Sequence, residues 1–379
     1  MIQLLSIDDP KVLFNHPSHS PSFSWWYIDV LNEQGDGCVC IFSQGLPFLP
    51  ASSTPKSDRY AVNVVIYKKG KEAFYLLQEF PKSEVHFERT ESHPLSIVRK
   101  ETWRIGGHTF HRHIKNGMVH CVVELCSTVH ESSEDSAEAH AVSGKIEMSG
   151  PLISSLDPAG RQDSTHHWVP MTTQCTADVS FNIERYAMLF NGRAYHDSNI
   201  SIQPLEKLSI GHWWWVRASF EGQTWLVYLV EKTDSGKSME QSGSPVWLVA
   251  SVSAKGEWKQ HFVRTVTVHT KRQSLYGLSM PVNWEIALES GECLHVENIA
   301  WLDDSPFYQR AQVQMTCDES IGFGFMEHVA PTKLNIPWQQ PFIRMKTHFQ
   351  NTPGSFFSPL FTGPSNTRWS RQLAQCLPF

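Results

Sequence analysis

Short apolar and aromatic runs, separated by polar turn residues, recur along the first half of the chain. The runs are FSWWYIDVL (23–31), CVCIFSQ (38–44), YAVNVVIY (60–67), EAFYLLQ (72–78) and MVHCVVELCS (118–127). Turn residues follow the first run and the third run, at 32–37 and at 69–71. Strands of this length with turns at regular intervals are typical of an antiparallel barrel or sandwich.

The second half repeats the same pattern. Its runs are HWWWVRASF (212–220), TWLVYLV (224–230), SPVWLVASVS (244–253) and WKQHFVRTVTVHT (258–270). Helical periodicity is sparse, because Pro or Gly interrupts most candidate stretches, and we expect only a short terminal helix around 368–374. The pattern therefore predicts an all-β protein.

The length of the chain and one change of pattern predict two domains. A chain of 379 residues exceeds what one hydrophobic core usually organises. Pro204 precedes a new strand pattern that begins at His212. We therefore predict domains at 1–205 and 206–379. The polar segments 131–144 and 233–243 are expected to be exposed loops, and the tail 352–366 is expected to pack irregularly on the second domain.

Composition and charge indicate which classes of partner and which cellular compartment to expect. The formal net charge is −6, and Lys and Arg do not cluster, so nucleic-acid binding is not expected. The start MIQLLSIDDP does not resemble a signal peptide, and no 18-residue apolar window occurs, which predicts a cytoplasmic protein that does not span a membrane. Any peripheral membrane contact would use exposed loops, because basic amphipathic helices are not evident. Oligomeric state stays open.

Several kinds of catalytic or cofactor site find no support in the motifs. The eight cysteines show no C-x-x-C spacing and are expected to be free thiols, and the 19 histidines form no His-Glu-x-x-His motif, so no metal site is predicted. A G-x-S-x-G elbow, a G-x-G-x-x-G loop and a Walker loop are also missing. We therefore expect a protein that works without a cofactor.

Three segments combine aromatic rings with ionisable groups: SWWYIDV (24–30), HHWVP (166–170) and AYHDSN (194–199). Side chains alternate between the two faces of a strand, so residues two apart share one face. His166 and Trp168 are expected to share a face, as are Tyr195 and Asp197. Tyr27 and Asp29 form a similar pair with Trp25 on the same side, although such residues can equally be buried groups that tie strands together.

These segments, with HWWWVRASF and GFGFMEH (322–328), resemble the two-domain carotenoid 1,2-hydratase (hydroxyneurosporene synthase) and AttH-like proteins. Fungal lipocalin-like Diels-Alderases are more distant relatives. The resemblance runs from about Trp25 to His328. It implies two lipocalin-like antiparallel β-barrel or sandwich domains with a deep apolar pocket, and hence a large apolar small molecule as substrate.

The resemblance also implies site residues. In the hydratases a His-x-Trp pair and a Tyr-x-Asp pair are proposed to carry catalysis, and here these positions are His166, Trp168, Tyr195 and Asp197. The chain departs from the family where the second motif continues as Ser198-Asn199-Ile200-Ser201, which suggests a reshaped pocket. The candidate substrate-binding residues are Trp25, Trp26, Tyr27, Asp29 and Trp214.

These residues suit the protonation of a carbon–carbon double bond. A carboxyl group in an apolar pocket stays protonated near neutral pH, so Asp197 is the candidate acid, with Tyr195 and His166 as orienting or relaying groups. Indole faces, such as that of Trp168, stabilise the carbocation. His166 could then accept the proton that the attacking water loses.

Three functions remain open at this stage. The first is an enzyme that protonates an isoprenoid-type substrate to give hydration or cyclisation, which makes it a hydro-lyase or a protonation-initiated cyclase. The second is a pericyclase that traps a reactive conformation, and the third is a carrier of apolar ligands without catalysis. The replacement of Asp197 by Asn distinguishes them, because only the first function needs a carbon acid.

Overall fold

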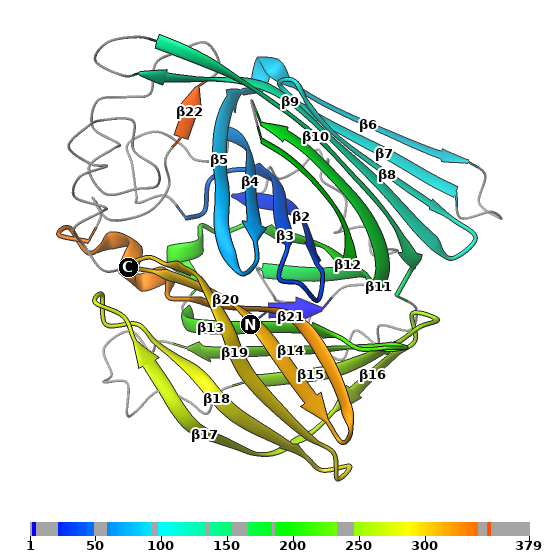
Figure 1. Cartoon of the computed structure of the whole chain (residues 1–379), viewed down its shortest axis with the longest axis vertical. Helices are drawn as coiled ribbons and strands as arrows, with labels where there is room; N and C mark the ends of the chain where they lie inside the picture. The colour runs from blue at the N-terminus through cyan, green and yellow to red at the C-terminus, as the bar shows by residue number, and fades with distance from the viewer. Residues whose placement is uncertain are drawn as a thin grey trace.

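The protein is built from β-strands that form two separate sheets (Figure 1). The computed structural model describes residues 2–4, 22–48, 59–92, 98–132, 137–153, 166–183, 186–208, 210–232, 246–339 and 347–349. Within these ranges, three short 3-10 helices accompany the strands: η3 (Lys82–Glu84), η4 (Leu205–Lys207) and η6 (Pro331–Asn335). No helix in these ranges is long and apolar enough to cross a membrane.

The first sheet has 13 strands, in the order β22-β5-β4-β3-β2-β12-β11-β10-β9-β8-β7-β6, with β1 paired to β11. Neighbouring strands are antiparallel except at β1 and β22, which run parallel to their partners. The strands are β1 (Ile2–Leu4), β2 (Phe23–Leu31), β3 (Gly37–Gln44), β4 (Arg59–Lys68), β5 (Lys71–Pro81), β6 (Val85–Ser92), β7 (Val98–Ile105), β8 (His108–Lys115), β9 (Met118–Ser132), β10 (Ala137–Pro151), β11 (His166–Ile183), β12 (Tyr186–Ser201) and β22 (Thr347–Phe349).

The second sheet has nine antiparallel strands, in the order β16-β15-β14-β13-β21-β20-β19-β18-β17. They are β13 (Ile210–Ser219), β14 (Gln223–Lys232), β15 (Val246–Ser253), β16 (Trp258–His261), β17 (Val263–Gln273), β18 (Ser279–Leu288), β19 (Cys293–Asp304), β20 (Tyr308–Cys317) and β21 (Ser320–Val329). Both sheets curl into barrel-like halves, one above the other in Figure 1. The predicted all-β class with two lipocalin-like antiparallel halves is confirmed.

The chain passes from one sheet to the other between Ser201 and Ile210. The strands from β13 to β21, which end at Val329, all belong to the second sheet. β22 then pairs with β5 at the edge of the first sheet. The division into domains 1–205 and 206–379 stays a prediction.

One loop prediction is wrong. Segment 131–144 was expected to be an exposed loop, but β9 and β10 form a long hairpin through it, with Ser132 opposite Ala137 and Ser127 opposite Val142. The two strands are joined by hydrogen bonds between backbone N–H and C=O groups, which polar side chains do not prevent. Segment 233–243, the tail 352–366 and the expected helix at 368–374 lie outside the described residues.

Two tight turns set the register of hairpins in the first sheet. Lys69 and Gly70, between β4 and β5, both have positive φ angles, of 51° and 70°. Asn116 and Gly117, between β8 and β9, have φ angles of 51° and 71°. Two consecutive residues of positive φ form the turn whose twist matches that of an antiparallel pair, and Gly and Asn tolerate this conformation best.

Three large apolar clusters form most of the interior of the described part of the chain, beside a small one of Leu46, Ala61 and Leu77. One lies inside the curl of the first sheet, a second lies inside the curl of the second sheet, and a third lies between the two sheets. β2 is buried along its whole length because its two faces contribute to different clusters. Trp26 and Ile28 pack in the first sheet's interior, whereas Trp25 and Tyr27 pack in the layer between the sheets.

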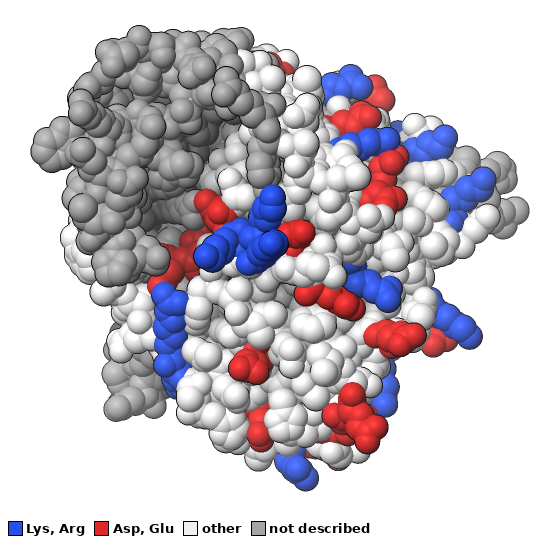
Figure 2. Space-filling model, in the orientation of Figure 1, with Lys and Arg blue, Asp and Glu red and all other residues white. Residues whose placement is uncertain are grey.

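The surface and the thiols carry less information about function. On the face shown in Figure 2, acidic and basic side chains are interspersed over both sheets. The seven described cysteines are all free, and Cys126 is exposed while Cys293 is half-buried. Free thiols are as expected from their spacing.

Candidate active site

A small cavity lies in the layer between the two sheets. Six aromatic side chains, two carboxyl groups and one amide form its walls. The first sheet supplies Trp25, Tyr27, Trp168, Asp197 and Asn199, and the second supplies Trp213, Trp215, Tyr228 and Glu327.

Asp197 is held by donors from its own and the neighbouring strand. Its Oδ2 accepts hydrogen bonds from Trp168 Nε1 at 2.7 Å and from the Tyr195 hydroxyl at 2.8 Å. Its Oδ1 accepts a longer bond, of 3.2 Å, from Asn199 Nδ2. Burial raises the pKa of Asp197 to about 7, although the two bonds to Oδ2 oppose the increase. Because Oδ2 already has two donors, a proton on this carboxyl group sits on Oδ1.

His166 reaches this carboxyl group through Asn199. The ring Nε2 of His166 lies 3.1 Å from Asn199 Oδ1, and the amide of Asn199 donates to Asp197 on its other side. The amide oxygen can only accept, so Nε2 of His166 carries a hydrogen. Burial lowers the pKa of His166 to about 3, which keeps the ring neutral. His166 does not line the cavity.

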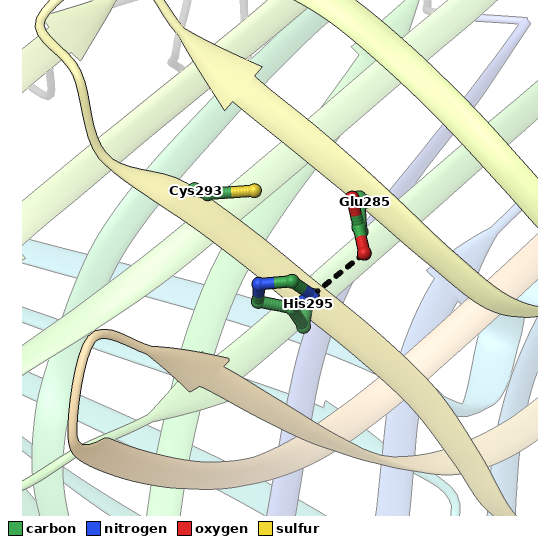
Figure 3. Close-up of side chains that lie close together, drawn as sticks. All are labelled: Glu285, Cys293 and His295. Carbon is green, nitrogen blue, oxygen red and sulfur yellow. Dashed lines mark ion pairs between the residues drawn. The ribbon is translucent and has the colours of Figure 1, made fainter.

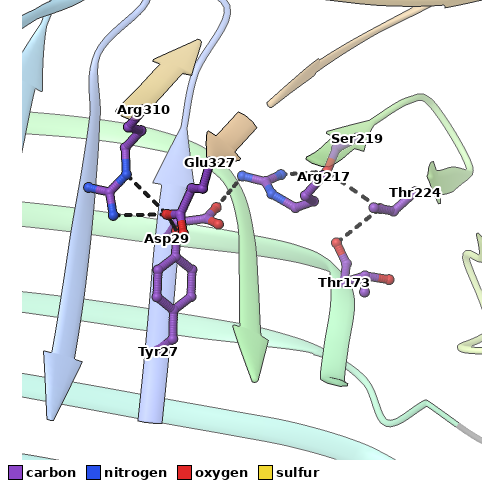
Figure 4. A network of polar contacts seen from close by, with 8 residues as sticks. All are labelled: Tyr27, Asp29, Thr173, Arg217, Ser219, Thr224, Arg310 and Glu327. Atoms are coloured by element: carbon purple, nitrogen blue, oxygen red, sulfur yellow. Dashed lines mark hydrogen bonds and ion pairs between the residues drawn. The ribbon is translucent and has the colours of Figure 1, made fainter. Parts of the chain in front are cut away.

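Glu327 supplies the second carboxyl group of the cavity (Figure 4). Its Oε1 accepts hydrogen bonds from Nε and Nη2 of Arg310 at 3.0 and 2.9 Å, and from the Tyr27 hydroxyl at 3.2 Å. Arg310 also donates to the Tyr67 hydroxyl at 2.7 Å. Burial raises the pKa of Tyr27 well above its usual range, so this phenol is a neutral donor to Glu327.

Asp29 joins the two sheets and does not line the cavity. It forms an ion pair with Arg217 of β13, and both side chains are fully buried (Figure 4). Arg217 also donates to Ser219 at 2.7 Å. Burial raises the pKa of Asp29 to about 6, although Arg217 opposes this increase. Asp29 is therefore better described as a contact between the sheets than as a wall of the cavity.

Two of the candidate substrate-binding residues point away from the cavity. Trp26 lies in the interior of the first sheet, where the guanidinium of Arg112 stacks 4.0 Å above its ring. Trp214 lies on the far face of β13 and stacks on His328 with ring centroids 4.5 Å apart. Both assignments are corrected, because alternation along a strand sends their side chains to the opposite face from Trp25 and Trp215.

Several residues of the cavity escaped the sequence analysis. Trp213 and Trp215 flank the chosen Trp214, and Glu327 lies within the GFGFMEH segment that carried part of the resemblance. The run of three tryptophans contains no cue that shows which face meets the other sheet. Tyr228 gave no signal beyond its place in an apolar run, since its neighbour Trp168 is 60 positions away.

The two carboxyl groups differ in their surroundings and hence in their chemistry. Asp197 is buried and has no charged partner at hydrogen-bonding distance among the residues that the structure describes, whereas Glu327 has the guanidinium of Arg310. Two carboxyl groups in such different surroundings can act as an acid and a base in one site. Aromatic faces between them can stabilise a cation.

Comparison with known proteins places the chain in a family. A family model described as the carotenoid hydratase CrtC matches residues 99–351. The acyclic carotenoid 1,2-hydratase of Thiocapsa roseopersicina is 23% identical over 305 residues, which cover 77% of this chain and 64% of that enzyme. The match thus spans slightly less than two thirds of the length of that relative.

Two solved structures share the fold. An AttH-type protein of Nitrosomonas europaea is 13% identical and superposes with a TM-score of 0.50, over 86% of this chain and 97% of its own. CghA, crystallised with Sch210972, is 12% identical and superposes with a TM-score of 0.54, over 81% of this chain and 88% of its own. At these identities the similarity concerns the fold alone. Since the family match covers more than half of the 379 residues, as the sequence motifs predicted, the chain belongs to the CrtC carotenoid hydratase family.

Proposed function

We propose that this protein is a hydratase or cyclase that protonates a carbon–carbon double bond of a large apolar, isoprenoid-type substrate in the cavity between the sheets. One observation carries the proposal: a buried carboxyl group, Asp197, with its pKa raised to about 7, lines a cavity walled by aromatic rings. Membership of a carotenoid hydratase family supports the substrate class. The cavity is small, which suits the reacting end of a long isoprenoid better than its whole length.

Asp197 acts first. Its Oδ1 proton passes to one alkene carbon, the π electrons form the new C–H bond, and a tertiary carbocation remains on the other carbon. The hydrogen bonds from Trp168 and Tyr195 then stabilise the carboxylate that is left behind. Burial keeps the acid protonated near neutral pH, so that a proton is available for transfer to carbon.

The aromatic walls hold the cation. The indole and phenol faces of Trp25, Trp215 and Tyr228 line the cavity without offering a reactive nucleophile. Attraction of a desolvated cation to such a face contributes about 2 kcal/mol. This lowers the barrier to protonation while leaving the cation free to react with water or with a second alkene.

Glu327 completes hydration. A water molecule attacks the cation, its oxygen forms the new C–O bond, and the proton that it loses passes to the Glu327 carboxylate. This carboxylate belongs to the second sheet, and hydrogen bonds from Arg310 and Tyr27 orient it toward the cavity. Exchange with solvent returns both carboxyl groups to their starting states. His166, which was expected to accept this proton, is assigned here a positioning role through Asn199, because its Nε2–H faces the amide.

The test compares wild type with Asp197→Asn in a host that makes acyclic isoprenoids, including lycopene, with a parallel incubation in deuterated water. We expect a product heavier by one water, or an isomer with deuterium on carbon, in wild type and in the control Asp178→Asn, whose carboxyl group pairs with Asn191 on the exposed face. Asp197→Asn should give neither. A product that persists in Asp197→Asn would contradict protonation and favour a pericyclase, and ligand binding without any product would favour a carrier.

Glu327→Gln separates the two halves of the reaction. If Glu327 only accepts the proton from water, this variant should still place deuterium on the alkene carbon. Its yield of the hydrated product should fall by about 100-fold or more, as is typical for loss of a general base. A wild-type yield of alcohol in Glu327→Gln would exclude this role while leaving the role of Asp197 intact.

A further inference from the structure

A second group of reactive side chains lies far from the cavity, on the outer face of the second sheet. Glu285 of β18 and both Cys293 and His295 of β19 lie close together there (Figure 3). Their neighbours in sequence, such as Ile286 and Leu294, point inward to the core of the second sheet. Alternation along the two strands therefore turns the three polar side chains outward together.

The pairing of the strands brings these groups into one cluster. Glu285 lies directly opposite His295, and Cys293 is two residues before His295 on the same face. The carboxylate, thiol and imidazole ligand atoms all lie within 4.8 Å of one another. His295 Nδ1 is 3.1 Å from Glu285 Oε1, and His269 Nε2 of β17 is 3.0 Å from the same oxygen.

The fourth group is His269, which lies at an irregularity in the pairing of β17 with β18. The register between β17 and β18 shifts between Val268 and Thr270, so His269 is the extra residue of a bulge. A bulge re-aims a side chain and is common near functional sites. Here it directs the imidazole of His269 to the carboxylate that His295 also contacts.

The combination of ligand types is more specific than an exposed acidic cluster. One thiol, two imidazoles and one carboxylate are ligands that Zn²⁺ accepts in tetrahedral sites, with bond lengths of about 2.0–2.3 Å. In such a tetrahedron neighbouring ligand atoms lie roughly 3.3–3.8 Å apart. The ligand atoms of Glu285, Cys293 and His295 lie within 4.8 Å of one another. His269 Nε2 lies 3.0 Å from Glu285 Oε1, so rotations of these half-exposed or exposed side chains can bring the four groups to such distances.

We propose that Glu285, Cys293 and His295, with His269 as the fourth ligand, bind a borderline divalent transition metal such as Zn²⁺. The metal displaces the thiol proton and replaces the hydrogen bonds between imidazole and carboxylate. It connects three adjacent strands, of which β17 is the edge strand of the second sheet. The site acts on the stability of this edge and is independent of the chemistry in the cavity.

The sequence analysis expected no metal site, since no paired cysteines or His-Glu-x-x-His motif occur. The ligands are spread over 269–295 and are brought together by strand pairing and a bulge, which linear spacing does not reveal.

Cobalt provides a direct test, because thiolate-bound Co²⁺ has a charge-transfer band and a tetrahedral site has intense visible bands. We expect full-length, chelator-treated protein to bind one equivalent of Co²⁺ with both features and to release it to Zn²⁺. Cys293→Ser should abolish the charge-transfer band. Cys126→Ser, which removes an exposed thiol outside the cluster, and His86→Ala, which removes an exposed histidine paired with Glu88, should leave the spectrum unchanged.

Thermal unfolding gives a second measurement. A metal that binds only the folded state raises the unfolding temperature, and the increase grows with the concentration of free metal. We expect Zn²⁺ to stabilise wild type and Cys126→Ser but not Cys293→Ser or His295→Ala. Failure to bind Co²⁺, binding without the charge-transfer band, or a spectrum unchanged in Cys293→Ser would each overturn the proposal.

Discussion

The indole nitrogen of Trp168 donates a 2.7 Å hydrogen bond to Oδ2 of Asp197, and this bond connects β11 to β12 at the wall of the cavity. The bond opposes the effect of burial on the carboxyl group, so the pKa of Asp197 is about 7 and would be higher without it. The same indole lines the cavity beside Tyr228. One residue thus tunes the proposed acid and lines the substrate site.

The pH dependence of the proposed reaction follows from this bond. If protonated Asp197 is the acid, kcat/KM should be constant below pH 7 and should fall about tenfold per pH unit above it. Trp168→Phe removes a hydrogen-bond donor that lowers the pKa of Asp197. The pH above which kcat/KM falls, the descending limb of the profile, should therefore move to higher pH, although the reaction itself becomes slower. Initial rates across a pH series test this. A limb that stays at the same pH in the variant would contradict the role of Trp168.

The stability of the protein should also depend on Asp197. Its pKa is raised from 3.8 to about 7 in the folded state. Between these pH values Asp197 carries a proton in the folded state that it has mostly lost in the unfolded state. The contribution of this group to the free energy of unfolding is therefore greatest at low pH and declines as pH rises to 7, by at most about 1.4 kcal/mol per pH unit.

Urea unfolding of wild type and Asp197→Asn at several pH values measures this effect. The variant should show a flatter dependence, above all between pH 6 and 7, where Asp29, with a pKa of about 6, contributes less. Equal slopes for the two proteins would mean that Asp197 is not perturbed by burial.

Trp215 and Trp214 offer a matched pair of substitutions on one strand. Trp215 lines the cavity, whereas Trp214 stacks on His328 on the opposite face of β13. Trp215→Leu should lower kcat by about 30-fold, which corresponds to the loss of about 2 kcal/mol of cation stabilisation. Trp214→Leu should stay within a few-fold of wild type. Comparable losses in both variants, with circular dichroism unchanged, would argue against a carbocation held by Trp215.

The buried ion pair between Asp29 and Arg217 should matter for stability. Both side chains are fully buried, so Arg217→Met leaves a carboxyl group without its partner and should cost about 3–5 kcal/mol in the free energy of unfolding. The double variant Asp29→Asn, Arg217→Met should recover most of this loss. Denaturant unfolding at pH 8 measures both. A double variant as unstable as the single one would show that packing, and not the unpaired charge, dominates.

The local part of the architecture could be read from the chain. Alternating aromatic and polar positions, with turn residues between the runs, predict antiparallel strands because a strand exposes its side chains to opposite faces with a period of two. The same alternation correctly placed Tyr195 with Asp197 and His166 with Trp168, and the hydrogen bonds among Trp168, Tyr195 and Asp197 follow from it. Family motifs added the expected substrate class.

What only the tertiary structure decided is which face of each strand meets the other sheet. β2 and β13 are apolar on both faces, so their sequences do not distinguish Trp25 from Trp26 or Trp215 from Trp214. Glu327 joins the site because β21 packs opposite β2, 300 positions earlier in the chain. Strand order and packing between sheets arise from contacts of high sequence separation, and a local pattern of side chains contains no record of them.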